Sequence, residues 1–183
     1  MRSFIGIDIP RSIAEGLREI QEEIKNVSNV KLVEPENMHI TLKFLGEIQE
    51  SKVTEIGRRL EKIGKEFKSF NVRLRGAGCF PSLKYIRIVW IGVEEGAMEI
   101  LGIQRRIDDE LKSIGFKKEK KFHPHLTIAR VKNYRAKKEL ASLIESKKDI
   151  EVGEFKVREI NFKKSTLTKK GPVYEDLLNI PLG

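Results

Sequence analysis

The chain is poor in features that define several classes of protein. Cys79 is its single cysteine, which excludes a disulfide framework and a thiolate metal cluster. No apolar run approaches the roughly 20 residues that span a bilayer. The apolar start contains Asp8 and is too short for a signal peptide. We therefore expect a protein of the reducing cytoplasm with no membrane partner.

The composition is that of a globular protein with an excess of positive charge. Of 183 residues, 39% are hydrophobic and 34% are charged, which is enough to bury a core. Lys and Arg number 36 against 27 Asp and Glu, for a net charge of +9. Such an excess favours polyanionic partners, nucleic acid first. Surfaces rich in Lys and Glu also occur in proteins from hot environments, so charge alone defines no site.

Hydrophobic periodicity predicts strands that alternate with helices along a single domain, residues 1–183. The expected strands are 3–9, 32–33, 37–45, 70–76, 85–93, 125–131, 151–163 and 173–178. The expected helices are 11–25, 51–67, 98–114 and 136–146. A loop that contains Phe80 and Pro81 should join strands 70–76 and 85–93. No linker separates domains, so any two lobes must pack against each other.

A short internal repeat is the most informative feature. His39-Ile40-Thr41-Leu42 recurs about half a chain later as His125-Leu126-Thr127-Ile128, and a predicted helix follows each copy. Two of only three histidines begin this pattern. The repeat indicates two related lobes with one such strand each.

The repeat places chemistry on one face of each strand. Because side chains alternate, His39 shares a face with Thr41, and His125 shares a face with Thr127, about 7 Å apart along the strand. If a pseudo-twofold axis relates the lobes, the two pairs can face each other across a cleft.

Two facing histidines suit in-line displacement at phosphorus. One neutral imidazole takes a proton from the attacking hydroxyl or water, and the other, protonated, gives one to the departing ribose oxygen. The hydroxyls of Thr41 and Thr127 can bind the non-bridging phosphate oxygens.

The motifs and their flanks resemble a known family. MHITLKFLGE and FHPHLTIAR, with the FIGIDIP start, Phe80-Pro81, Trp90, Ser165-x-Leu167 and Gly171-Pro-Val-Tyr174, are similar to the 2H phosphoesterases. The closest resemblance is to their RNA 2′,3′-cyclic phosphodiesterase branch, also called 2′-5′ RNA ligases. It runs along nearly the whole chain.

The resemblance implies an α+β fold of two similar lobes related by a pseudo-twofold axis. Each lobe would be an antiparallel sheet with helices on its outer face, and the catalytic cleft would lie between the lobes. The implied reaction opens a terminal 2′,3′-cyclic phosphate to a 2′-phosphomonoester. His39 would be the general acid and His125 the general base, with no metal and no nucleotide cofactor; the residues themselves do not choose between the two roles.

Two basic residues near the motifs are candidates for phosphate contact. Lys43 has the same strand parity as His39 and Thr41 and could point into the cleft. Arg130 matches an arginine that follows the second motif in the family. Strict alternation would place Arg130 opposite His125, so its role requires the strand to twist or end near Ala129.

Other residues define no metal site but can contact RNA. His123 has no Cys partner and no carboxylate at ligand spacing, so packing or hydrogen bonding is expected of it. Phe44, Phe80, Trp90 and Tyr174 could stack a base, and Phe80 is the candidate for the cleft. Lysines at 117–121, 163–164 and 169–170 are expected in solvated loops, where they could guide an RNA backbone.

Three other functions stay open. The same site could work as a 2′-5′ ligase that joins tRNA half-molecules, because both directions share one transition state. The protein could be a non-catalytic RNA-binding module, or a phosphodiesterase for small cyclic nucleotides, whose binding would respond little to salt. We expect a monomer that acts on RNA ends bearing a 2′,3′-cyclic phosphate.

Overall fold

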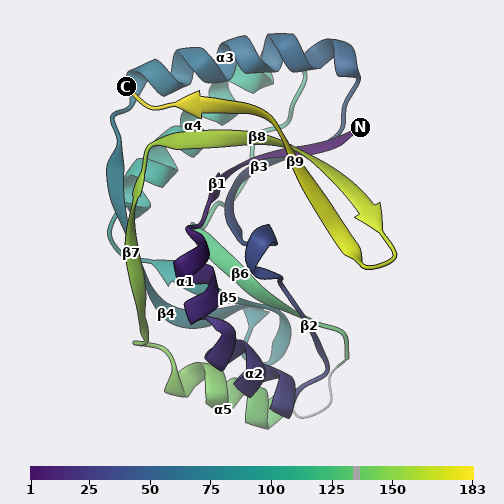
Figure 1. Ribbon diagram of the computed structural model, residues 1–183, viewed down its shortest axis with the longest axis vertical. Helices are drawn as coiled ribbons and strands as arrows, with labels where there is room; N and C mark the ends of the chain where they lie inside the picture. Colours follow the sequence, from purple (N-terminus) through teal and green to yellow (C-terminus); the bar gives the residue numbers. More distant parts are fainter. Residues whose placement is uncertain (134–136) are drawn as a thin grey trace.

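The computed structural model describes residues 1–133 and 137–183 as an α+β protein of two lobes (Figure 1). The strands are β1 (Arg2–Asp8), β2 (Val30–Leu32), β3 (His39–Glu47), β4 (Phe70–Ser82), β5 (Tyr85–Val93), β6 (His125–Val131), β7 (Glu151–Val157), β8 (Glu159–Thr168) and β9 (Gly171–Pro181). The helices are α1 (Arg11–Gly16), α2 (Arg18–Val27), α3 (Val53–Glu66), α4 (Ala97–Lys112) and α5 (Lys137–Ser146). No helix among these residues is both long and apolar enough to cross a membrane.

One curled antiparallel sheet runs through both lobes. Its strand order is β7-β4-β5-β6-β3-β1-β8-β9, with β2 paired to β6. The lobes meet at the β3–β6 seam, where the register consists of the single pair Ile40 and Leu126. Counted outward from the seam, β6-β5-β4-β7 mirrors β3-β1-β8-β9, as a pseudo-twofold axis requires.

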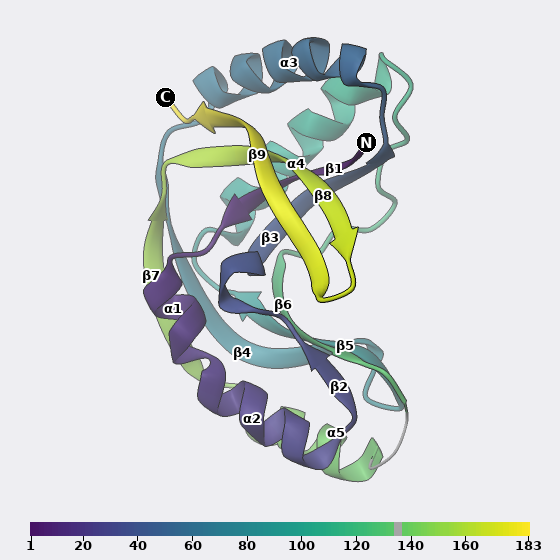
Figure 2. The same cartoon turned by 45° about the vertical axis from the view of Figure 1, so that its right-hand side comes forward.

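The helices cover the outer face of each lobe, and some of them pack on the lobe opposite to the strand that they follow. Helices α3 and α4 pack on the lobe of β3, β8 and β9, whereas α1, α2 and α5 pack on the lobe of β4 to β7 (Figures 1 and 2). The helices that follow β1 and β5 therefore each cross to the opposite lobe. This exchange explains why the sequence contains no linker.

Helix α3 shows how the pattern of residues determines packing. Ile56, Leu60 and Ile63 recur at helical spacing and are fully buried. At Gly64 a Cβ would lie 2.5 Å from the carbonyl oxygen of Pro181, so only glycine lets β9 approach this closely. Helix α3 thus packs directly against the backbone of β9, the last strand of this lobe.

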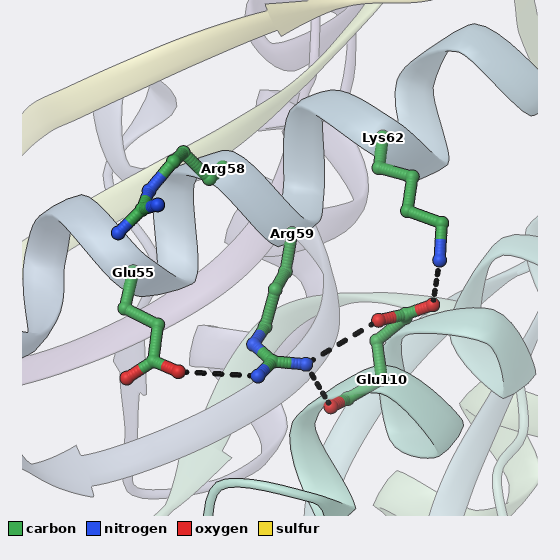
Figure 3. A pocket seen from close by; sticks show the side chains of 5 residues that line it. All are labelled: Glu55, Arg58, Arg59, Lys62 and Glu110. Carbon is green, nitrogen blue, oxygen red and sulfur yellow. Dashed lines mark hydrogen bonds and ion pairs between the residues drawn. The ribbon is translucent and has the colours of Figure 1, made fainter.

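A charged hollow between α3 and α4 belongs to this packing (Figure 3). Arg59 donates to Glu55 at 3.1 Å and to the carbonyl oxygen of Glu110 at 3.2 Å, and Lys62 contacts Glu110 at 2.8 Å. Because these charges neutralise one another, we interpret the hollow as an ion-pair network that ties the two helices together.

Three boundaries differ from the sequence predictions. The predicted loop at 77–84 is wrong, because β4 continues to Ser82 and pairs with β5 through a register shift at Phe80 and Pro81. The predicted strand 151–163 is two strands that divide at Arg158, and the predicted helix 11–25 is interrupted at Leu17. The register shift at Phe80 and Pro81 is accommodated by pairing between strands, which periodicity does not report.

Candidate active site

The two repeated motifs lie side by side at the seam between the lobes. On β3, His39 and Thr41 are half-buried and share a face, while Ile40 and Leu42 are buried on the other face. Strand β6 repeats this pattern with His125 and Thr127. Alternation therefore holds along both motifs, and the seam brings the two histidine–threonine pairs together.

Both histidines are tethered in the same way. The Nδ1 atom of His39 lies 2.7 Å from the carbonyl oxygen of Asn37, and Nδ1 of His125 lies 2.6 Å from that of His123. A carbonyl oxygen only accepts, so Nδ1 carries the hydrogen in both rings. The Nε2 atom of each neutral ring is then the one able to accept a proton. The two lobes thus present two equivalent acid–base groups.

Aromatic rings hold each imidazole in place. The His39 ring stacks on Phe4 with centroids 4.6 Å apart, and Tyr174 meets it edge-on at 5.3 Å. The His125 ring meets Phe80 edge-on at 4.9 Å. Phe80 also contacts Trp90 at 5.2 Å, so its ring packs beside the site and orients His125. Phe4 escaped the sequence reasoning, although alternation in FIGIDIP places it on one face with Gly6 and Asp8.

The protein environment favours the neutral form of both histidines. Burial lowers the pKa of His39 to about 4, against the opposing effect of the Asn37 carbonyl, and the positive charges of Lys163 and Arg130 lower it further. Burial also lowers the pKa of His125, with smaller effects from His123 and Arg130. A bound phosphate would raise both pKa values, because an anion stabilises imidazolium.

Matching bulges in the two strands change which residues face the cleft. The β1–β3 register moves from Gly6–Thr41 to Ile5–Lys43, which skips Leu42. The β5–β6 register moves from Trp90–Thr127 to Val89–Ala129, which skips Ile128. Side chains beyond each bulge therefore reverse their faces relative to strict alternation.

The first consequence is that Lys43 does not face the cleft. It is 3% exposed, and its ammonium contacts Asp108 on α4 at 2.5 Å and the carbonyl oxygen of Lys117 at 2.7 Å. Asp108 also accepts from Gln104 and from the Glu119 backbone N–H. The parity prediction for Lys43 is wrong because the bulge turns it toward the helices.

The second consequence is that Arg130 lies on the cleft side. It is exposed and pairs directly across from Ile88, two residues from Trp90 on β5. Its positive charge lowers the pKa of both His39 and His125. The bulge thus moves the side chain of Arg130 to the face that carries His125, as a phosphate contact by Arg130 requires.

Phe44 is the equivalent residue on β3. It lies directly opposite Phe4, and the two rings are 6.2 Å apart. Phe44 is 61% exposed, an unusual position for a large apolar side chain. The sequence named Phe44 as a possible base-stacking residue, and the repeat relates it to Arg130, because Phe44 follows His39 at the same spacing as Arg130 follows His125.

Lys163 is also placed differently from the sequence prediction. It was expected in a solvated loop but is 7% exposed on β8. Its ammonium bridges Asp8 at 2.9 Å and Asp176 at 2.6 Å, and Asp8 pairs with His39 across the sheet. Lys163 therefore contributes to the electrostatics of His39 rather than to the outer surface.

No group of three or more His, Cys, Asp or Glu side chains is arranged to hold a metal ion in residues 1–133 and 137–183. The polar groups that β3 and β6 gather on one face are the two imidazoles, the two threonine hydroxyls and the Arg130 guanidinium. This set of groups is the one expected of a two-histidine phosphoesterase.

Comparison with known proteins agrees with this class. The model of the LigT-like phosphoesterase family matches the chain twice, over residues 7–90 and 91–174, and the chain belongs to this family. The two matches correspond to the two copies of the repeat.

Relatives cover the whole chain. An RNA 2′,3′-cyclic phosphodiesterase of Methanocaldococcus jannaschii is 44% identical over 96% of this chain and 97% of its own length. One of Aquifex aeolicus is 37% identical over 100% and 98%. Among solved structures, a protein of Thermus thermophilus has a TM-score of 0.81 at 26% identity, covering 100% of this chain and 98% of its own. The fold of E. coli LigT in complex with 3′-AMP matches with a TM-score of 0.79 at 22% identity, over 99% and 97%.

Proposed function

We propose that the protein is an RNA 2′,3′-cyclic phosphodiesterase that hydrolyses a terminal cyclic phosphate to a 2′-phosphomonoester without a metal ion. The observation that carries the proposal is the paired tether, which leaves Nε2 of His39 and of His125 as the proton-exchanging atoms beside Arg130. The relatives' shared activity, at 44% and 37% identity, supports the choice of substrate.

The reaction follows from these groups. His125 accepts a proton at Nε2 from the water that attacks phosphorus, while His39 in its protonated form donates one from Nε2 to the departing O3′. A P–O bond to water forms as the P–O3′ bond breaks, and solvent exchange restores both rings. The guanidinium of Arg130 and the hydroxyls of Thr41 and Thr127 stabilise the charge on the non-bridging oxygens.

The electrostatics of the free protein do not select His39 as the acid. Burial lowers the pKa of His39 to about 4, so the ring is neutral near pH 7 in the free protein and can act as the acid only once it is protonated in the complex. The anionic substrate restores protonation as it binds, because it raises that pKa. The assignment rests on the resemblance to the family.

The test is hydrolysis of a short RNA with a cyclic end in the presence of EDTA. We expect wild type to release a 2′-phosphate, and His39→Ala and His125→Ala to lose about 10²–10⁴-fold in kcat. His123→Gln is the matched control, since it removes the third imidazole but keeps the carbonyl that tethers His125. Turnover that survives both alanine substitutions, or requires a metal, would overturn the proposal.

The same groups can act with an RNA 5′-hydroxyl in place of water as the nucleophile. Its oxygen then forms the new P–O5′ bond as the P–O3′ bond breaks, with the same two proton transfers, and the product is a 2′-5′ phosphodiester. Joining of tRNA half-molecules is therefore a second candidate activity of this site, and we expect the protein to act as a monomer in either case. Supplying a 5′-hydroxyl RNA beside the cyclic-ended strand distinguishes the two, because only ligation gives a longer product. Both histidines and both threonines are in place on one face, which argues against a non-catalytic binding module.

A further inference from the structure

Three lysines outside the catalytic groups lie on β2 beside Arg130 and at the tip of the β8–β9 hairpin. Lys31 on β2 pairs directly with Arg130 on β6, so the two side chains leave the same face of the sheet. Lys169 and Lys170 form the turn between β8 and β9, and both are exposed. Both lysines belong to the runs that were expected to guide an RNA backbone, and the catalytic chemistry does not use them.

The β8–β9 hairpin brings these lysines together. In Figure 2 it leaves its own lobe and reaches toward β6. At its tip, a Cβ built on Gly171 would lie 3.3 Å from Nζ of Lys31. The amide of Asn37 donates to the carbonyl oxygen of Pro172 at 3.1 Å, which ties the start of β9 to the segment between β2 and β3. Two elements that are far apart in the sequence thus form one basic patch.

The lysines of this patch differ from several basic residues elsewhere on the sheet. Lys163 is bound by two carboxylates, and Arg73 and Arg75 share Glu94. Within residues 1–133 and 137–183, none of Lys31, Lys169 and Lys170 has a carboxylate partner. Like charges gathered without counter-charges repel one another, so they contribute no ion-pair stability and attract an anion instead.

We propose that Lys31, Lys169 and Lys170 form a subsite for the phosphodiester backbone of RNA next to the reacting end. This proposal rests on the proposed function and extends it. The terminal cyclic phosphate lies at Arg130, and the strand leaves past Lys31 toward the hairpin tip. The enzyme then prefers oligonucleotides to cyclic mononucleotides, which have no second phosphate to place there.

The test compares two substrates, 2′,3′-cyclic AMP and a four-nucleotide RNA with a cyclic end. The test protein carries Lys31→Gln, Lys169→Gln and Lys170→Gln together. The matched control carries Lys25→Gln, Lys65→Gln and Lys138→Gln, which are exposed lysines on α2, α3 and α5. We expect wild type and the control to prefer the RNA in kcat/KM, and the test protein to lose about tenfold on the RNA with little change on the mononucleotide.

Salt dependence gives a second readout. Each phosphate contact on a single strand contributes about 0.7 to the slope of log affinity against log salt, so the test protein should have a slope shallower by up to about 2. Binding of a fluorescent RNA that ends in a 2′-phosphate measures this without turnover.

Two results separate the proposals. A test protein that binds and cleaves the RNA as wild type does, with the same salt slope, would overturn the backbone subsite while leaving the hydrolase proposal intact. Absence of turnover on both substrates by wild type would contradict the proposed function, and RNA binding that still depended on the three lysines would then support the subsite by itself.

Discussion

Phe44 and Arg130 are structural counterparts on the two central strands. Each follows a motif histidine beyond a one-residue bulge, and each is exposed on the face that carries the histidine–threonine pair. One lobe therefore presents an aromatic ring to the cleft where the other presents a guanidinium. Because the two positions differ in chemistry, we expect them to bind different parts of the substrate. Phe44 would stack on the base, and Arg130 would bind the phosphate.

Arg130→Ala should lower kcat by about 10²–10³-fold, because it removes a charge that stabilises the transition state. Arg130→Lys should recover part of this loss, since an ammonium keeps the charge but not the bidentate geometry of guanidinium. Steady-state kinetics on a cyclic-ended RNA checks both. Near-normal kcat in Arg130→Ala would show that phosphate is bound elsewhere.

Phe44→Leu should raise KM with little change in kcat, because stacking binds the ground state and the transition state alike. A base–aromatic stack contributes about 1–3 kcal/mol, or a factor of about 5–150 in KM. Met98→Ala on α4 is the control, since Met98 is another apolar side chain with 73% exposure. An unchanged KM in Phe44→Leu would exclude a stack on this ring.

The pKa of His39 should make the protein less stable as the pH falls. In the folded state this pKa is lowered to about 4 from 6.5, so between these values the unfolded chain binds the extra proton. Stability from this group is complete above pH 6.5 and declines toward pH 4, by up to about 3 kcal/mol. Denaturant unfolding at pH 7 and pH 4.5 measures the change.

His39→Gln serves as the reference for that measurement, because it removes this titration and leaves every other group in place. The difference between the two pH slopes isolates the contribution of His39. NMR titration of the His39 ring in the free protein gives its pKa directly, and a value near 6.5 would contradict the burial argument.

Lys43→Met should destabilise the fold by about 3–5 kcal/mol, since it leaves the Asp108 carboxylate buried without its cation. The double variant Lys43→Met with Asp108→Asn should recover much of this loss, because no unpaired charge remains. Lys65→Met, an exposed position on α3, is the control. Denaturant unfolding of wild type, Lys43→Met, Asp108→Asn and the double variant tests the pair, and additive single effects would argue against direct coupling.

The sequence by itself was sufficient for the parts of this protein that depend on local pattern. Apolar alternation and helical spacing predicted most elements, and the repeated His-x-Thr-x motifs predicted two lobes with His39 and His125 on equivalent strands. These inferences succeed because side-chain direction in a regular strand or helix depends only on the spacing of residues.

Only the tertiary structure decided which neighbours of the motifs reach the cleft. The bulges after Thr41 and Thr127 bury Lys43 and expose Phe44 and Arg130, and nothing in the spacing of the chain marks where an extra residue enters a ladder. The carbonyl tethers, the Phe4 ring behind His39 and the contact of Lys31 with the hairpin tip likewise join segments through packing. Pairing between strands creates these contacts, so they exist only once the sheet has formed.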